Sequence, residues 1–147
     1  MDKLNLNSHI EQVQVISFSH WDYLNILPKE VINSDNSVNR FLNWENINPK
    51  FAFYYDYLNN ELEIKEYLLK SPLIGHDKVV MTISSDRPII SMNTNYFIEN
   101  WCEFVTIARD QCIVWSPDKS LLLEFNSYEK KLFSNFEIKA STSIYND

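Results

Sequence analysis

The chain has 147 residues, of which 45% are hydrophobic and 22% charged, and its formal net charge at pH 7 is −7. This balance is typical of a globular protein and excludes a disordered chain, while no apolar run approaches the roughly 20 residues that span a bilayer. The N-terminal residues also lack the apolar region and cleavage site of a signal peptide. We therefore expect one domain over residues 1–147, located in the cytoplasm without membrane contact.

The acidic charge is spread over both halves of the chain, and the lysines and arginines form no basic cluster. Binding to nucleic acid depends on such clusters, so the sequence argues against nucleic acid as a partner. A basic protein would complement the acidic surface, because opposite charges speed association and select partners. A net charge of this size also keeps a protein soluble in the absence of any partner.

The first elements in the chain are a predicted strand and a predicted short helix. Residues 10–18 carry the apolar alternation that is typical of a strand. Pro28 interrupts the segment that follows. A polar cluster at residues 33–37 then precedes apolar residues at helical spacing between 38 and 44. This pattern predicts a short helix that is capped within the polar cluster and ends before Pro49.

Residues 51–57 alternate again and predict a second strand. Its inward face would carry Phe51, Phe53, Tyr55 and Tyr57, and its outward face Ala52, Tyr54 and Asp56. The next segment has two interpretations. Asn59 and Asn60 favour a hairpin turn, since asparagine tolerates positive φ. Alternatively Asn60 caps a helix that ends before Pro72, and the helix-forming residues after Asn60 favour this second interpretation.

The sequence of the second half of the chain predicts a helix with one hairpin before it and one hairpin after it. Residues 77–92 fit two strands around a turn, as do residues 111–126. Between them, residues 95–110 have a helical period with an apolar side, formed by Phe97, Trp101, Phe104, Val105 and Ala108. Residues 131–139 alternate as a last strand. The elements together predict an α+β fold, with a largely antiparallel sheet and two or three helices packed on one side.

The sequence carries none of the common catalytic frameworks. Its single glycine, Gly75, leaves no room for a dinucleotide-binding turn, a phosphate-binding loop or a nucleophile elbow. The three histidines show no metal-binding spacing, and the two cysteines are expected to be reduced and buried. Glu99 and Glu103 share the outer face of the predicted helix, where we expect them to be hydrated. We therefore predict no catalytic residue, no metal and no cofactor.

A small hydrolytic enzyme is the alternative from another functional class. His20 is followed by Trp21 and Asp22, and His76 by Asp77, so either imidazole could act with a nearby carboxylate as acid and base. A deep pocket around one of these histidines would favour this interpretation. A regulatory or structural module without any activity is a third possibility.

Three segments resemble the immunity proteins of bacterial contact-dependent growth inhibition and related polymorphic toxin systems. They are "YFIENWCEFV" at 96–105, "CIVWSPDKSLLLEF" at 112–125 and "FSNFEI" at 133–138. The resemblance implies a cytosolic inhibitor with no catalysis of its own. Such an inhibitor binds the toxic C-terminal domain of a cognate effector, often a nuclease, and covers or distorts its active site. The sequence leaves the oligomeric state of the chain open.

Candidate contact residues for such a partner cluster around residues 54–66. Aromatic rings among carboxylates suit a protein interface, because the rings supply large contact area and the carboxylates repel phosphate. The predicted partner-binding residues are Tyr54, Asp56, Tyr57, Glu61, Glu63 and Glu66. Toxins that act on nucleic acid tend to be basic, so these residues would face a surface of opposite charge.

Overall fold

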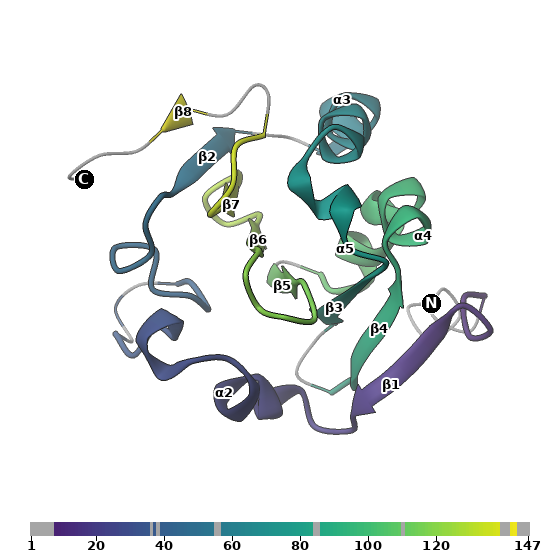
Figure 1. Ribbon diagram of the computed structural model, residues 1–147, viewed down its shortest axis with the longest axis horizontal. Coiled ribbons are helices and arrows are strands. Elements are labelled where there is room, and N and C mark those ends of the chain that lie inside the picture. The colour runs from purple at the N-terminus through teal and green to yellow at the C-terminus, as the bar shows by residue number, and fades with distance from the viewer. Residues whose placement is uncertain are drawn as a thin grey trace.

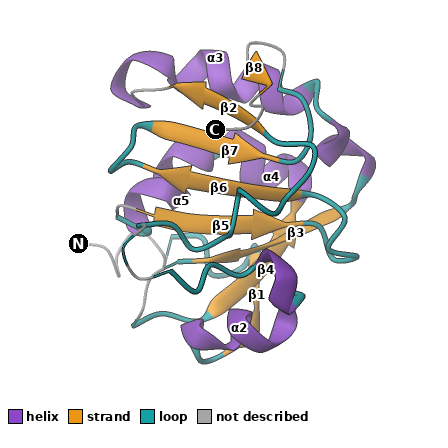
Figure 2. Ribbon diagram, turned by 90° about the vertical axis from the view of Figure 1, so that its left-hand side faces the viewer, coloured by secondary structure: helices purple, strands orange, loops and turns teal. Residues whose placement is uncertain are grey.

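The computed structural model describes residues 8–35, 37, 39–54, 57–83, 86–109, 111–138 and 142–143, with backbone only at 57–59 and 142–143. Its centre is an eight-stranded sheet in which all neighbouring strands are antiparallel, in the order β1-β4-β3-β5-β6-β7-β2-β8 (Figure 2). The strands are β1 Val13–Ser17, β2 Phe51–Tyr54, β3 Lys78–Thr82, β4 Ile89–Asn93, β5 Gln111–Trp115, β6 Leu122–Asn126, β7 Lys131–Ser134 and β8 Thr142–Ser143.

Helices cover both faces of this sheet unequally. The α-helices are α2 Tyr23–Ile26, α3 Tyr57–Leu69, α4 Thr94–Glu99 and α5 Trp101–Ile107, and short 3₁₀ turns lie at His20–Asp22, Lys29–Val31 and Pro72–Gly75. Figure 1 shows α3, α4 and α5 grouped on one side of the strands, with α2 on the other. The predicted α+β fold is therefore confirmed, including the antiparallel sheet with helices gathered on one side.

The larger hydrophobic core lies between the sheet and helices α3, α4 and α5. Trp101 stacks on Phe125 of β6 with ring centroids 5.5 Å apart, and its indole N–H donates to the carbonyl of Glu61 at 3.0 Å. One side chain thus joins α5 to both the sheet and α3. The five apolar residues predicted for residues 95–110 are all buried. The predicted single helix is instead two, because Asn100 leaves the helical conformation with φ −120° and ψ 20°.

The smaller core lies on the opposite face of the sheet. Trp44 stacks on Phe133 of β7 with ring centroids 5.6 Å apart, and other buried side chains from residues 23–47 pack around this pair. The helix predicted after residues 33–37 is wrong, since the described residues 39–50 contain only turns, extended chain and one bridge residue, Leu42. The physical reason is a buried carboxylate of β6, Glu124, which accepts N–H groups of this segment that a helix would otherwise use internally.

The segment after residue 50 confirms the helix and corrects its start. Strand β2 ends at Tyr54, and α3 already begins at Tyr57, so Asn60 lies inside the first turn and is not the cap. Phe53 is buried and Tyr54 exposed, as predicted. The prediction that Tyr57 continues the strand is wrong, and Tyr55 lies outside the described residues. The remaining predicted strands, in 10–18, 77–92, 111–126 and 131–139, are confirmed as β1, β3, β4, β5, β6 and β7.

Candidate functional site

Helix α3 has one buried and one exposed side. Ile64 and Leu68 are fully buried against the larger core. The remaining surface of the helix exposes Glu61, Leu62, Glu63, Glu66 and Leu69, which we call the acidic α3 face. Leu62 is 75% exposed, because it lies two residues before Ile64 and so on the outer side of the helix. The helix therefore presents carboxylates around an apolar centre.

Hydrogen bonds hold one carboxylate of the acidic α3 face in place. Glu63 accepts from the side-chain amide of Asn60 at 2.8 Å and from the hydroxyl of Tyr67 at 3.1 Å. The hydrogen bond to Glu63 raises the pKa of Tyr67, so this hydroxyl stays a donor at neutral pH. Lys65, in contrast, is drawn to α4, where its ammonium lies 2.9 Å from the carboxylate of Glu99. The face keeps its negative charge because this neighbouring cation is already paired.

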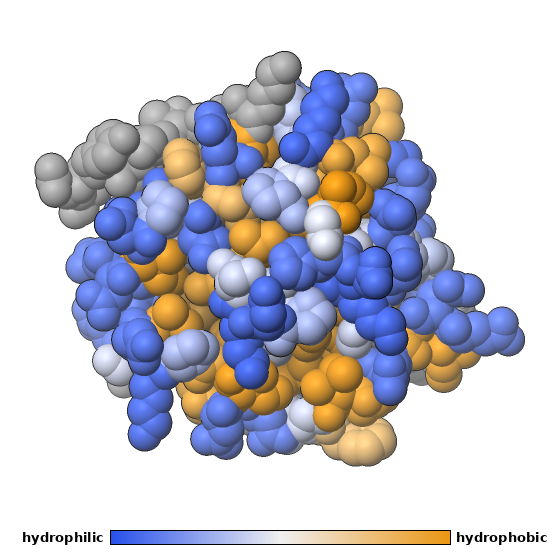
Figure 3. Space-filling model, in the orientation of Figure 1, coloured by the Kyte–Doolittle hydropathy of each residue, from blue (hydrophilic) through white to orange (hydrophobic). Residues whose placement is uncertain are grey.

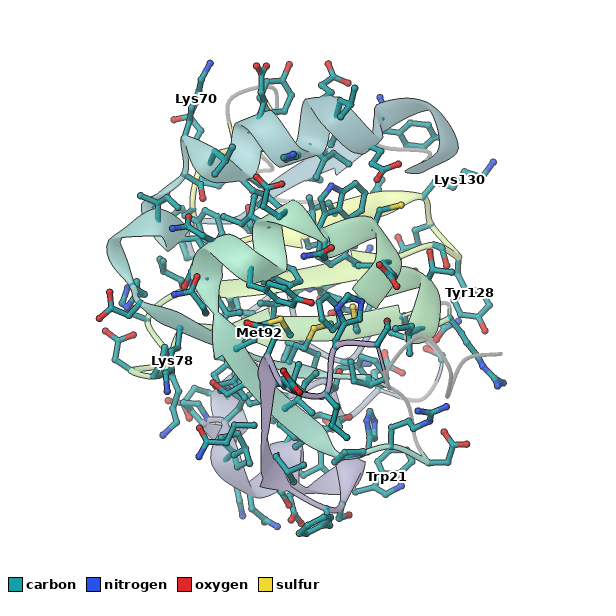
Figure 4. The ribbon with its side chains drawn as sticks, turned by 90° about the vertical axis from the view of Figure 1, so that its right-hand side faces the viewer. Trp21, Lys70, Lys78, Met92, Tyr128 and Lys130 are labelled. Atoms are coloured by element: carbon teal, nitrogen blue, oxygen red, sulfur yellow. The ribbon has the colours of Figure 1, made fainter. Side chains whose placement is uncertain are left out.

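A shallow groove runs along α3 beside these residues, lined by Leu62, Glu63, Lys65, Glu66, Tyr67 and Leu69. Figure 4 shows the side chains of α3 projecting away from the sheet, with Lys70 at the end of the helix. Carboxylates around exposed leucines suit contact with a surface that is both apolar and basic. The lining of the groove combines two carboxylates, two leucines, a lysine and a tyrosine.

The structure brings together only some of the six predicted contact residues. Glu61, Glu63 and Glu66 are all exposed on α3, and their role as contact residues stays a prediction. Tyr54 is 67% exposed and pairs with Lys131 of β7, at the end of the strand that leads into α3. Tyr57 is the first residue of α3, and its side chain is not described. Asp56 lies outside the described residues.

Sequence reasoning missed the apolar centre of this face. Leu62 and Leu69 were not among the predicted contact residues, although both are exposed. Helical periodicity could have predicted the exposure of Leu62. When Ile64 and Leu68 face the core, Leu62 lies on the outer side of the helix. That phase was hidden while a hairpin turn at Asn60 remained an alternative.

We expected Glu99 and Glu103 to be hydrated, but each of them pairs with a basic side chain. Glu99 pairs with Lys65, and Glu103 Oε2 lies 3.0 Å from Nε2 of His9. Nδ1 of the same histidine is hydrogen-bonded to the hydroxyl of Tyr96 in α4. The buried His9 ring thereby fastens the N-terminal turn to α4 and α5, which is a structural role for both the histidine and the glutamate.

The two histidines of the enzyme alternative lie in different surroundings. His20 is 2% exposed and packs edge-on against the rings of Trp21, Tyr23 and Phe41, and burial lowers its pKa. Its Nδ1 has no hydrogen-bond partner among the described residues. His76 is half-buried, in the loop before β3. A polar pocket does lie close to Phe41, but neither histidine belongs to its lining, which is Tyr23, Asn33, Asp35, Asn39, Arg40, Phe41 and Gln111.

The carboxylate beneath this pocket, Glu124, is fully buried and fully hydrogen-bonded. One oxygen accepts from the Leu42 N–H at 3.0 Å and the Trp44 indole at 2.9 Å, and the other from the Phe41 N–H at 3.0 Å and the Gln111 amide at 3.1 Å. Burial raises the pKa of Glu124, while these donors act in the opposite direction. With four donors and no exposed surface, the carboxylate serves to anchor the loop.

Three further observations concern metals, membranes and cysteines. Within the described ranges, no group of three or more His, Cys, Asp or Glu side chains is placed to hold a metal ion. None of the helices that the structure describes combines the length and the apolar character needed to cross a membrane. Cys102 is half-buried and Cys112 buried, both as free thiols, and burial raises the pKa of each. Comparisons with protein-family models, curated proteins and solved structures find no match.

Proposed function

We propose that this protein is a cytoplasmic immunity protein that binds and neutralises a cognate toxin domain of basic, nuclease type, with no catalysis of its own. The observation that carries the proposal is the acidic α3 face, in which Glu61, Glu63 and Glu66 surround an exposed Leu62. Interfaces of this kind combine an apolar centre, which is desolvated on binding, with charges at the rim that select the partner. The resemblance of residues 96–138 to such inhibitors supports the same conclusion.

The electrostatics of the face favour a cationic partner. Its glutamates belong to a chain of net charge −7, and the adjacent Lys65 is neutralised by Glu99. An approaching basic domain is attracted over about a Debye length, which raises the association rate and makes it sensitive to salt. Leu62 and Leu69 then contribute the apolar contact that slows dissociation.

The direct test begins with the genes beside the gene for this chain, where we expect a large secreted effector that ends in a toxin domain, and co-expresses that domain with the chain. The chain is expected to rescue cells from that domain and to bind it in solution. Failure to rescue, with both proteins folded and expressed, would overturn the proposal.

A charge-reversal variant tests whether the acidic α3 face makes the contact. Glu61→Lys, Glu63→Lys and Glu66→Lys together should slow association with the same toxin domain about 10- to 100-fold at low salt, and binding should lose most of its salt dependence. The matched control is Glu30→Lys, Glu45→Lys and Glu137→Lys, three exposed glutamates outside α3 that change the net charge equally. If both triple variants behave alike in stopped-flow binding, the face is not the contact surface.

A further inference from the structure

Among the strands that the structure describes, β1 forms one outer edge of the sheet and pairs with β4 alone. Its three central residues, Gln14, Val15 and Ile16, are all exposed. An edge strand presents a row of backbone N–H and C=O groups that can pair with a further strand. The opposite edge of the sheet ends in β8, which is only two residues long.

The β1 edge lacks most of the features with which proteins protect such edges. Lysine, proline and inward-pointing charges commonly block pairing at an edge strand. Residues 12–19 contain none of these, and the segment carries no charge. The protective features in the described residues are the short length of the strand, five residues, and a shift in its register with β4 between Val15 and Ser17. This edge therefore remains suited to pairing.

Exposed apolar side chains concentrate beside this edge. Of the eleven exposed large hydrophobic residues of the described chain, six lie between residues 10 and 24: Ile10, Val15, Ile16, Phe18, Trp21 and Leu24. Phe18 is the most exposed of all, at 87%. Apolar groups also gather along the lower margin of the surface in Figure 3, where Figure 1 places α2 and the end of β1. Figure 4 shows Trp21 beside this end of β1.

We propose that β1 pairs antiparallel with the β1 of a second copy of this chain, so that two sheets join across a two-fold axis. In an antiparallel pair centred on Val15, the backbone groups of the two strands are complementary by symmetry. Glu11 of each copy then lies opposite Ser19 of the other, so no like charges face each other. Each copy has a net charge of −7, but the two copies would meet at residues 12–19, which carry no charge.

The area beside β1 is sufficient for a stable dimer. Covering the exposed parts of the six apolar side chains and the outer strand edge would bury about 600 Å² per copy, or on the order of 1,200 Å² in the pair. That value lies at the lower end of specific protein–protein interfaces. The exposed aromatic rings of Phe18 and Trp21 contribute most of it.

The dimer does not depend on the proposed function and does not obstruct it. The order of the strands places β1 at one edge of the sheet and β2, which leads into α3, next to the other. Pairing through β1 leaves the acidic α3 face of each copy uncovered. The two faces would lie at the far ends of the joined sheet.

The first test is the mass in solution by sedimentation equilibrium across the micromolar range. The wild-type chain is expected to approach twice its chain mass of 17.5 kDa. Ile16→Lys should weaken the dimer at least about tenfold, since lysine blocks an edge strand. Leu62→Lys makes the same change at an exposed position of α3 and should leave the dimer intact. A wild-type chain that is monomeric at every concentration overturns the proposal, as does an Ile16→Lys variant that dimerises unchanged.

The second test identifies the strand at the interface by cross-linking. Cysteine is placed at Val15, the residue that lies opposite its own symmetry mate in this register, in a Cys102→Ser background, and the variant is oxidised with oxidised glutathione. Opposed residues of an antiparallel pair have Cα atoms about 5 Å apart, which permits a disulfide between the copies. A Tyr54→Cys variant in the same background should not cross-link. Absence of cross-linking at Val15 overturns the proposal even where the wild type is dimeric.

Discussion

At the residue scale, Glu124 shows how one side chain can organise an irregular segment. In the sheet, Glu124 of β6 lies opposite Ile113 of β5 and Phe133 of β7. Both neighbours belong to the smaller core, so the carboxylate lies on the same face of the sheet as that core. Backbone N–H groups that leave water must find acceptors, and the extended chain at Phe41 and Leu42 finds two in this carboxylate. The anchored loop in turn covers the face of the sheet opposite α3.

Replacement of this anchor should destabilise the protein severely. In Glu124→Ala, four N–H donors lose their acceptor inside the protein, and we expect a loss of about 3–5 kcal/mol in the free energy of unfolding. Urea denaturation checks this value. The control is Glu45→Ala, an exposed glutamate beside Trp44, with an expected change under about 0.5 kcal/mol. Equal stability of the two variants would contradict the anchoring role.

Also at the residue scale, the Arg40–Glu129 pair should make stability depend on pH. Arg40 donates two hydrogen bonds to Glu129, at 2.6 and 2.8 Å, and its guanidinium lies 4.5 Å from the ring centroid of Phe133. These hydrogen bonds lower the pKa of Glu129 below its ordinary value of 4.5. The stabilisation by the ionised carboxylate is therefore complete above that value, and it is lost as the pH falls through the lowered pKa.

Glu129→Gln tests this dependence. The variant should be less stable than the wild type by about 1 kcal/mol at pH 7, and the difference should shrink as the pH falls below 4.5. Urea denaturation over a pH series measures both values. Glu30→Gln, at an exposed position, should give a small difference without this trend. A Glu129→Gln difference that grows toward acid pH would contradict the assignment.

At the scale of elements, α3 divides stability and binding between its two sides. Ile64 and Leu68 are fully buried in the larger core, whereas Leu62 is exposed. Helical periodicity places these residues on different sides of the same helix. The acidic α3 face can therefore change without disturbing the core that holds the helix.

A matched pair of alanine substitutions checks this division. Ile64→Ala should cost about 2–5 kcal/mol in the free energy of unfolding, because it removes buried methyl groups and leaves a cavity. Leu62→Ala should change the free energy by less than about 0.5 kcal/mol. Chemical denaturation measures both. A Leu62→Ala variant as unstable as Ile64→Ala would show that Leu62 packs inside the fold, and would remove the apolar centre from the proposed interface.

At the scale of the whole molecule, the sheet separates two surfaces of different character. The acidic α3 face follows β2 near one edge, while the exposed apolar residues beside β1 lie at the other (Figure 1). One surface is suited to a partner of opposite charge and the other to an uncharged strand. This separation allows both interactions to occur at once in the arrangement that we propose.

Local patterns in the sequence predicted most of the elements and half of the candidate site. The hairpins in residues 77–92 and 111–126 show as short apolar runs around a turn, and 95–110 has a helical period with only the break at Asn100 missed. Such periods depend on neighbours in the chain, so they are visible without the fold. Glu61, Glu63 and Glu66 are exposed, and their role as contact residues stays a prediction.

The tertiary structure alone decided three features. Residues 39–50 are irregular because Phe41 bonds to Glu124, a residue 83 positions away that no local pattern reveals. The phase of α3, which exposes Leu62, depends on packing against the core. The apolar pattern of β1 reads as an ordinary half-buried strand, but strand order puts it at an edge, where Val15, Ile16 and Phe18 stay exposed. The local sequence pattern shows which residues are apolar enough to be buried. Long-range contacts in the folded protein decide which of these residues are in fact buried.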